Sequence, residues 1–136
     1  MDALRRWWPA RRRTGFRPAD RRQLGRAAEE LALAHLERAG LSRLDRNVRA
    51  GRGEIDLILR DGDTLVFVEV RARADGALVS AAESLSARKC AKVRETAERL
   101  IAARPDWQAF YCRFDVVAVT ATANQTPEIQ WLRDAF

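Results

Sequence analysis

The sequence predicts an α/β domain in which a mixed β-sheet is flanked by helices. Three observations support this: a helical pattern of apolar residues near the N-terminus, three strand-like runs in the middle, and a second long helix followed by another strand. The expected order is therefore helix, three strands, helix, strand (αβββαβ). With 136 residues, 47% of them hydrophobic and 32% charged, the chain is long enough for one domain with its own core.

A first helix is expected over residues 20–39. Apolar side chains recur there at helical spacing, and Gly40 follows as a natural stop. β-branched and aliphatic residues then alternate with turn residues, which is typical of a meander. We expect strands over 44–48, 54–60 and 65–73, a tight turn at 50–53, and a hairpin turn at Asp61-Gly62-Asp63.

The second half of the chain predicts one more helix and one long strand. The helix should begin at Ala81 or Ser86 and end at Ala103, because a proline follows shortly afterwards. A strand rich in Phe, Tyr and Val is expected over 108–120. Residues 129–132 form a short segment that suits a last edge strand.

The positive charge of the chain is concentrated at its N-terminus. The formal net charge is +6 at pH 7, and residues 1–22 alone carry eight Arg against two Asp. Residues 23–136 are therefore neutral overall. We divide the chain into a basic arm (1–22), expected to be disordered by itself, and a single domain (23–136).

The arm has two interpretations. Its arginines, with Arg11, Arg12 and Arg13 as the densest group, suit contacts with nucleic-acid phosphates, while Trp7 and Trp8 suit stacking on bases. Alternatively, the arm is a solvated extension whose tryptophans pack on the domain.

Other residue types exclude several classes of protein. Cys90 and Cys112 have no CxxC spacing and no signal peptide precedes them, so we expect reduced thiols and a cytoplasmic location. His35 is the sole histidine and lies among Ala and Leu in the first helix, which argues against a multi-histidine zinc site or a Ser-His-Asp site. No run approaches the ~18 apolar residues of a membrane span, so no membrane partner is expected.

Two carboxylates stand out because they lie inside apolar strands. Asp56 belongs to the run Gly-Glu-Ile-Asp-Leu-Ile at 53–58, and Glu69 to Phe-Val-Glu-Val-Arg at 67–71. An unpaired carboxylate is costly to bury, so such a residue normally has a metal, a cationic partner or a catalytic function.

The parity of the hairpin decides whether these carboxylates meet, since strand side chains alternate between faces. A two-residue turn at Asp61-Gly62 would pair Glu54 with Glu69, and a four-residue loop would pair Asp56 with Glu69. In both registers Asp56, Glu69 and Arg71 share one face. A regular three-residue loop would separate them.

The residue types suit a metal-dependent phosphodiesterase. Mg²⁺ or Mn²⁺ is typically held by one or two carboxylates together with substrate phosphate oxygens, and activates a water for attack on phosphorus. Asp56 and Glu69 are thus the candidate metal ligands, with a cation from Arg71 close by. The alternative is a cross-strand salt bridge that joins either carboxylate to Arg71 or Arg73.

At these residues the chain resembles the YraN-like (UPF0102) family of bacterial proteins, within the PD-(D/E)XK nuclease superfamily. The resemblance covers residues 24–136 and rests on five motifs in the same order. They are the helix motif at 25–32 with Glu29, Asn47 with 53–58, the Phe-Val-Glu-Val-Lys-x-Arg string at 67–73, the basic helix positions Lys89 and Lys92, and 113–116 with the terminal Ala-Phe.

The resemblance implies a restriction-endonuclease-like core. It implies that Asp56 and Glu69 bind metal and that Glu29 lies nearby on the first helix. It also implies activity on nucleic acid, in a family close in type to Holliday-junction resolvases, with Mg²⁺ or Mn²⁺ as cofactor.

One residue departs from the family motif: Arg71 stands where the superfamily usually has Lys. Arginine stays protonated at physiological pH, so it cannot act as a general base, although it can clamp a phosphate. Either Arg71 suffices electrostatically, or another lysine has taken over, or catalysis is lost and binding remains. Lys89 and Lys92 are the chain's two lysines and share one helix face. They are either functional or part of a solvated face.

Three functions are therefore compared. The first is a metal-dependent endonuclease acting on DNA, branched or single-stranded, with Arg52, Arg73, Lys89 and Lys92 attracting the backbone. The second is an inactive nucleic-acid-binding module in a DNA-processing assembly. The third is a protein-interaction scaffold. A homodimer is compatible with the first, because residues 131–136 could serve as a dimer edge or as core packing.

Overall fold

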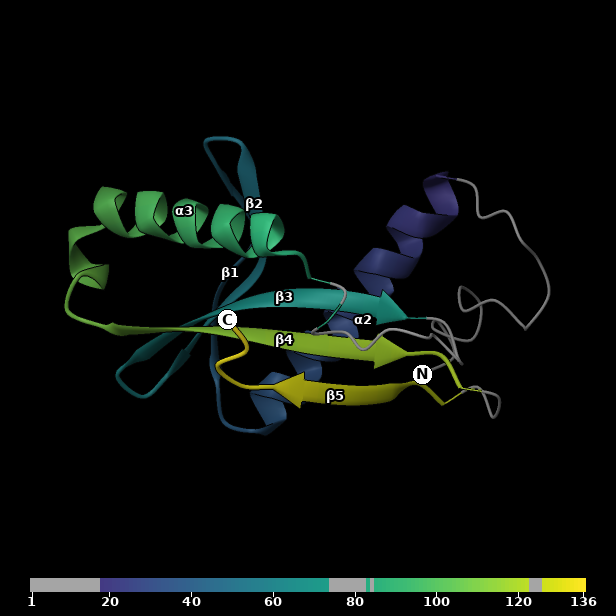
Figure 1. Cartoon of the computed structure of the whole chain (residues 1–136). Coiled ribbons are helices and arrows are strands. Elements are labelled where there is room, and N and C mark those ends of the chain that lie inside the picture. The colour runs from purple at the N-terminus through teal and green to yellow at the C-terminus, as the bar shows by residue number, and fades with distance from the viewer. Residues whose placement is uncertain (1–17, 74–82, 84, 123–125) are drawn as a thin grey trace.

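The computed structural model describes residues 18–73, 83, 85–122 and 126–136 (Figure 1). The predicted contacts of Arg11, Arg12 and Arg13 lie outside these residues. The described elements are helix α2 (Pro18–Arg38), strands β1 (Ser42–Ala50), β2 (Gly53–Asp61) and β3 (Thr64–Arg73), helix α3 (Ala87–Ala103), a 3-10 turn (Pro105–Trp107), and strands β4 (Tyr111–Thr120) and β5 (Glu128–Leu132). The predicted order αβββαβ is confirmed, together with the short final strand.

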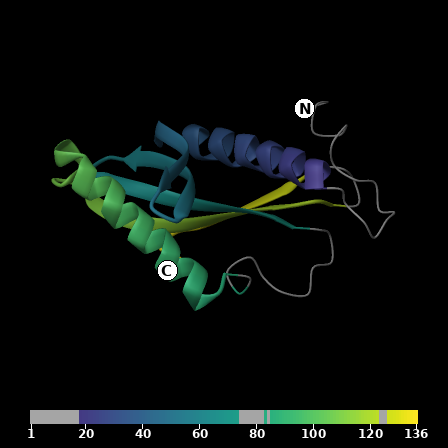
Figure 2. The same cartoon turned by 90° about the horizontal axis from the view of Figure 1, so that it is seen from above.

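One five-stranded sheet runs in the order β1-β2-β3-β4-β5. β3 and β4 are parallel, whereas the other neighbouring pairs are antiparallel, so the sheet is mixed as predicted. α2 and α3 lie on opposite sides of the sheet (Figure 2). This is the arrangement expected of a restriction-endonuclease-like core.

Each face of the sheet builds its own apolar layer. Val66 and Val68 of β3 pack in the layer beneath α2, while Leu65 and Phe67 pack in the layer beneath α3. β3 is therefore covered on both sides, which explains its nearly continuous apolar sequence. A polar side chain on this strand can avoid full burial only near the strand's end.

Both helices differ slightly from the predicted bounds. α2 begins at Pro18, within the segment counted with the arm, because proline is well tolerated in the first turn of a helix. α3 begins after Ser86, the second of the two expected starts. The Ser86 hydroxyl accepts a hydrogen bond from the backbone N–H of Lys89 and so caps the helix. None of the described helices is long and apolar enough to cross a membrane.

The β2–β3 hairpin adopts the register that pairs Arg60 with Leu65. The ladder extends one pair further, to Asp61 and Thr64, so the turn itself contains only Gly62 and Asp63. Gly62 has a φ of 60°, which glycine adopts without strain. Of the two predicted registers, the structure therefore contains the one that aligns Asp56 with Glu69.

The turn between β1 and β2 packs closely on α3. A Cβ atom at Gly53 would lie 1.9 Å from Oγ1 of Thr96, whose side chain is buried and donates to the carbonyl of Lys92. Only glycine permits this approach, so Gly53 determines how near the tip of the β1–β2 hairpin can come to the helix.

We expect Gly53→Ala to lower the free energy of unfolding by about 1–3 kcal/mol, because the added methyl group must displace Thr96 or the turn. Gly25→Ala is the matched control. No atom lies within 4 Å of the Cβ position there, so this helical glycine should gain about 0.5–1 kcal/mol. Urea unfolding of both variants measures the difference. Equal effects would contradict the close packing at Gly53.

Candidate active site

β2 and β3 separate at the two predicted carboxylates. Backbone pairing between these strands ends at Leu57 and Val68, whereas β3 remains paired with β4 as far as Arg73. The next residues in this register are Asp56 and Glu69. The strands thus form a fork, and the two carboxylates lie where it opens.

The side chain of Asp56 replaces the missing backbone partner. Its Oδ2 accepts a hydrogen bond of 2.9 Å from the backbone N–H of Val70. This bond holds the carboxylate in the fork and satisfies an N–H that β2 no longer reaches. The position of Asp56 is therefore set by the backbone of β3 as well as by its own strand.

A kink in β1 accompanies the fork. Asn47 lies opposite Asp56 and has a φ of 50°, and the pairing of β1 with β2 is interrupted between Arg46–Leu57 and Val48–Ile55. Asparagine is among the residues that tolerate this left-handed conformation. Beyond the kink the hairpin turns toward α3, where Ile55 joins the layer beneath that helix.

Desolvation makes both carboxyl groups reluctant to ionise. Glu69 is 4% exposed. Desolvation and the neighbouring Asp56 raise its pKa to about 7, against an opposing effect of Lys89. Desolvation and the charge of Glu54 also raise the pKa of Asp56, while the Val70 N–H, Lys89 and Glu69 act in the other direction.

Lys89 is the cation that contacts this pair. Its Nζ lies 3.4 Å from Oε1 of Glu69, and 45% of the lysine side chain is exposed. Lys89 stands in the first turn of α3, where the helix dipole disfavours a positive charge. The ion pair with Glu69 thus stabilises the Lys89 ammonium at a helix position that disfavours a positive charge.

Arg71 lies on the same face of β3 as Glu69, as predicted from strand parity. Its positive charge lowers the pKa of Glu69, but its effect ranks after those of Lys89. Among the described residues, Glu69 forms its ion pair with Lys89 rather than with Arg71. The predicted cross-strand salt bridge between Arg71 and these carboxylates is therefore absent from the described part of the chain.

Glu29 approaches the fork from α2, on the other side of the sheet. Its Oε2 is buried and has no hydrogen-bond partner among the described residues. The nearest cation is Nη2 of Arg46 at 3.9 Å. Desolvation and the charge of Asp56 raise the pKa of Glu29, so the two carboxyl groups lie close enough to interact.

These donors fit a hard divalent cation. The ligands that the site offers are carboxylate oxygens, one buried oxygen has no hydrogen-bond partner among the described residues, and desolvation raises the carboxyl pKa values, an effect that a bound cation would oppose. No three Asp, Glu, His or Cys side chains in the described ranges are placed to ligate one ion together. Asp56 and Glu69 are the pair that would hold it, and Mg²⁺ commonly has only one or two protein carboxylates.

The remaining predicted residues lie outside this cluster. Arg52 is exposed at the β1–β2 turn, Lys92 is exposed one turn beyond Lys89 on α3, and Arg73 is half-buried at the end of β3. The structure therefore unites Asp56, Glu69, Arg71, Lys89 and Glu29 around the fork, and separates the other cations from it.

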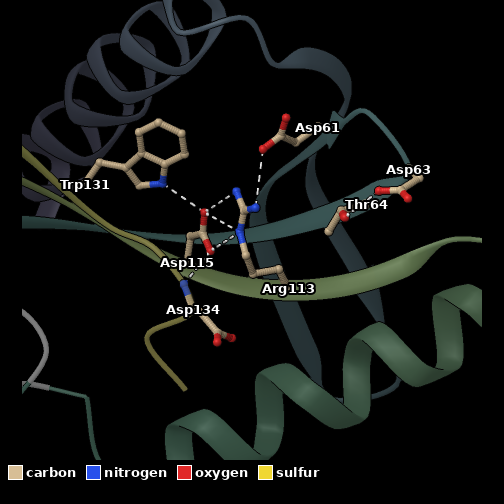
Figure 3. A network of polar contacts seen from close by, with 7 residues as sticks. All are labelled: Asp61, Asp63, Thr64, Arg113, Asp115, Trp131 and Asp134. Carbon is tan, nitrogen blue, oxygen red and sulfur yellow. Dashed lines mark hydrogen bonds and ion pairs between the residues drawn. The ribbon is translucent and has the colours of Figure 1, made fainter.

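Another buried carboxylate, that of Asp115, has a different role, which sequence reasoning missed. Asp115 is fully buried beside α2 and receives hydrogen bonds from Arg113, from Nε1 of Trp131 at 2.8 Å and from the N–H of Asp134 at 2.9 Å (Figure 3). Arg113 also reaches Asp61 at 3.3 Å. This network ties β5 and the C-terminus to the sheet. The only sequence signal was an Asp inside an apolar strand, the same signal as for Asp56.

The C-terminal residues contribute to the core. Trp131 packs with the layer beneath α2, and Phe136 packs against Phe114 with ring centroids 5.3 Å apart. Of the two roles considered for this segment, core packing is the one visible in the single chain.

Glu69→Gln should stabilise the protein at alkaline pH. The folded state holds the pKa of Glu69 at about 7, above its usual 4.5, so its contribution to stability is complete below pH 4.5 and is lost as the pH rises through 7. The loss amounts to about 3 kcal/mol. Glutamine removes it, so the variant should exceed the wild type in unfolding free energy at pH 8 and match it near pH 4.5.

Urea unfolding at both pH values measures this difference. Asp115→Asn is the matched control, because Asp115 is a buried carboxylate whose donors all favour its charge. This control should lose stability at pH 8. If Glu69→Gln also loses stability at pH 8, Glu69 is a structural ion-pair residue like Asp115.

Comparison with known proteins identifies the family. Residues 28–119 match the model of the uncharacterised protein family UPF0102. A UPF0102 protein of Pseudomonas aeruginosa (strain LESB58) is 47% identical over 116 residues, which cover 85% of this chain and 93% of the relative. One of Xanthomonas campestris pv. campestris (strain B100) is 44% identical over 119 residues, covering 88% and 95%. The chain belongs to the UPF0102 family.

Proposed function

We propose that this protein is a metal-dependent nuclease of the PD-(D/E)XK superfamily that hydrolyses phosphodiester bonds in DNA. The observation that carries the proposal is the pair of neighbouring carboxylates, buried Glu69 and half-buried Asp56, which lie where β2 and β3 diverge and whose pKa values are both raised by desolvation. A structural role alone would not favour such a pair, since it destabilises the fold at neutral pH and above.

Asp56 and Glu69 would hold Mg²⁺ or Mn²⁺ between them. When bound, such an ion polarises a phosphate oxygen and lowers the pKa of a coordinated water, which supplies the nucleophile. The Val70 N–H keeps the Asp56 carboxylate oriented through its 2.9 Å hydrogen bond. Glu29 would add negative charge from α2, and its buried Oε2 has no hydrogen-bond partner among the described residues.

The two nearby cations would act on the substrate phosphate. Arg71 has a planar guanidinium that stays charged and suits a bidentate contact with phosphate oxygens. Lys89 brings a compact ammonium within 3.4 Å of Glu69. The site therefore contains a lysine even though Arg71 occupies the motif position, because α3 supplies Lys89.

A second function follows if these cations suffice for binding but not for cleavage. The protein would then be a nucleic-acid-binding module, and the observation in its favour is Arg71 at the position of the usual motif lysine.

Cleavage assays separate the two functions. We expect the wild type to cut single-stranded, duplex or four-way-junction DNA with Mn²⁺ and not with EDTA. Asp56→Asn keeps an oxygen to accept from the Val70 N–H but loses the charge, so it should abolish cutting. Lys89→Ala should slow cutting about 100-fold, as expected for the loss of one stabilising group.

Arg71→Lys is the decisive control, and it should cut at a rate comparable to that of the wild type. Cutting by Arg71→Lys alone would mean that the native chain binds without cleaving. If no form cuts any of the three substrates, the nuclease proposal is wrong.

Metal binding should also be visible without any substrate. At pH 8, Mn²⁺ at about ten times its Kd should raise the Tm by about 5 °C, because the ion binds only the folded site. Asp56→Asn/Glu69→Gln should lose this increment. Glu128→Gln, which removes an exposed charge from β5, should keep it. An equal increment in all three proteins would place the ion elsewhere.

A further inference from the structure

A groove lies at the junction of the β1–β2 turn and α3. Its volume is about 540 Å³, and it is lined by Arg52 and Gly53 from the turn and by Lys92, Glu95, Thr96 and Arg99 from the helix. Figure 1 shows the tip of the hairpin beside the middle of α3. Gly53 and Thr96, which pack closely together, both line the groove.

The groove carries excess positive charge. Arg99 is neutralised by Glu95, four residues away on the helix, at 3.3 Å. Arg52 and Lys92 have no side-chain ion pair or hydrogen bond within the described part of the chain, and both are exposed. The lining of the groove therefore includes two unpaired cations, one from the turn and one from the helix.

The groove lies near the carboxylate site along both elements that line it. Lys92 is three residues beyond Lys89 on the same face of α3, a rise of about 4.5 Å. In β2, Gly53 lies three residues before Asp56. A strand that leaves the carboxylates along α3 would therefore reach Lys92 and then the turn that carries Arg52.

We propose that this groove holds the phosphodiester backbone of a single, unpaired nucleic-acid strand that leads to Asp56 and Glu69. This inference rests on the proposed function and names its substrate class. The groove has a volume of about 540 Å³ and carries one unpaired cation from the turn and one from the helix, which suits contacts with the phosphates of one strand.

The lining determines how the strand is recognised. The described residues around the groove include no aromatic side chain on which a base could stack. Contacts are therefore made to phosphates, with little preference for base sequence and a strong dependence on salt.

Binding can be measured without cleavage in the Asp56→Asn background. Fluorescence anisotropy would follow a labelled thymidine oligonucleotide and a blunt duplex of the same length over a range of salt concentrations. Adding Arg52→Ala/Lys92→Ala should weaken single-strand binding about tenfold, and lower the slope of log K against log salt by about 1.4, because two phosphate contacts are lost. Duplex binding should change much less.

Two further variants distinguish binding in the groove from a general effect of the protein's positive charge on nucleic-acid affinity. Arg26→Ala/Arg38→Ala removes two exposed positive charges from α2, on the opposite side of the sheet, and should leave the single-strand slope nearly unchanged. Arg52→Lys/Lys92→Arg keeps the charges and should retain the affinity. Urea unfolding verifies that each variant is folded.

The groove inference is overturned if Arg52→Ala/Lys92→Ala binds the single strand with the original affinity and slope. It is also overturned if single-strand and duplex affinity fall by the same factor. Metal-dependent cutting by the wild type tests the proposed function separately. If the wild type cuts DNA but Arg52→Ala/Lys92→Ala binds the single strand as before, only the groove inference is wrong. If that variant binds more weakly but the wild type does not cut, only the nuclease proposal is wrong.

Discussion

The hydrogen bond from the Val70 N–H to Asp56 is the contact on which the candidate site depends. Backbone pairing between β2 and β3 ends where the two strands diverge. The Val70 N–H of β3 therefore has no backbone partner on β2. Asp56 satisfies that donor with its side chain. The same bond therefore ends the ladder and fixes a carboxylate beside Glu69.

Three carboxylates of the sheet, buried Asp115 and Glu69 and half-buried Asp56, have two different kinds of environment. Asp115 is surrounded by donors from Arg113, Trp131 and Asp134, all of which stabilise its charge. Asp56 and Glu69 instead have each other as neighbours and share one lysine. The first arrangement strengthens the fold, whereas the second costs stability that a bound cation would restore.

The positive charges around the fork come from separate elements. β3 contributes Arg71, the first turn of α3 contributes Lys89, and the groove beyond adds Lys92 from the helix and Arg52 from the turn. Such an arrangement tolerates the change of the motif lysine to arginine, because a second cation reaches the carboxylates from a different direction. The positive charges also extend from the carboxylates along α3 toward the β1–β2 turn.

The sequence by itself determined the order of elements, the mixed sheet and the shared face of Asp56 and Glu69, while the structure chose between the two possible registers. These follow from local patterns: apolar periodicity, and the parity of a hairpin whose two strands are joined by a short turn. Only the tertiary structure decided that Lys89 contacts Glu69, that Glu29 reaches the fork with a partnerless oxygen, and that Asp115 is structural. The reason is that these contacts join elements distant in the chain, and they depend on how each helix is rotated and packed against the sheet, which no local spacing specifies.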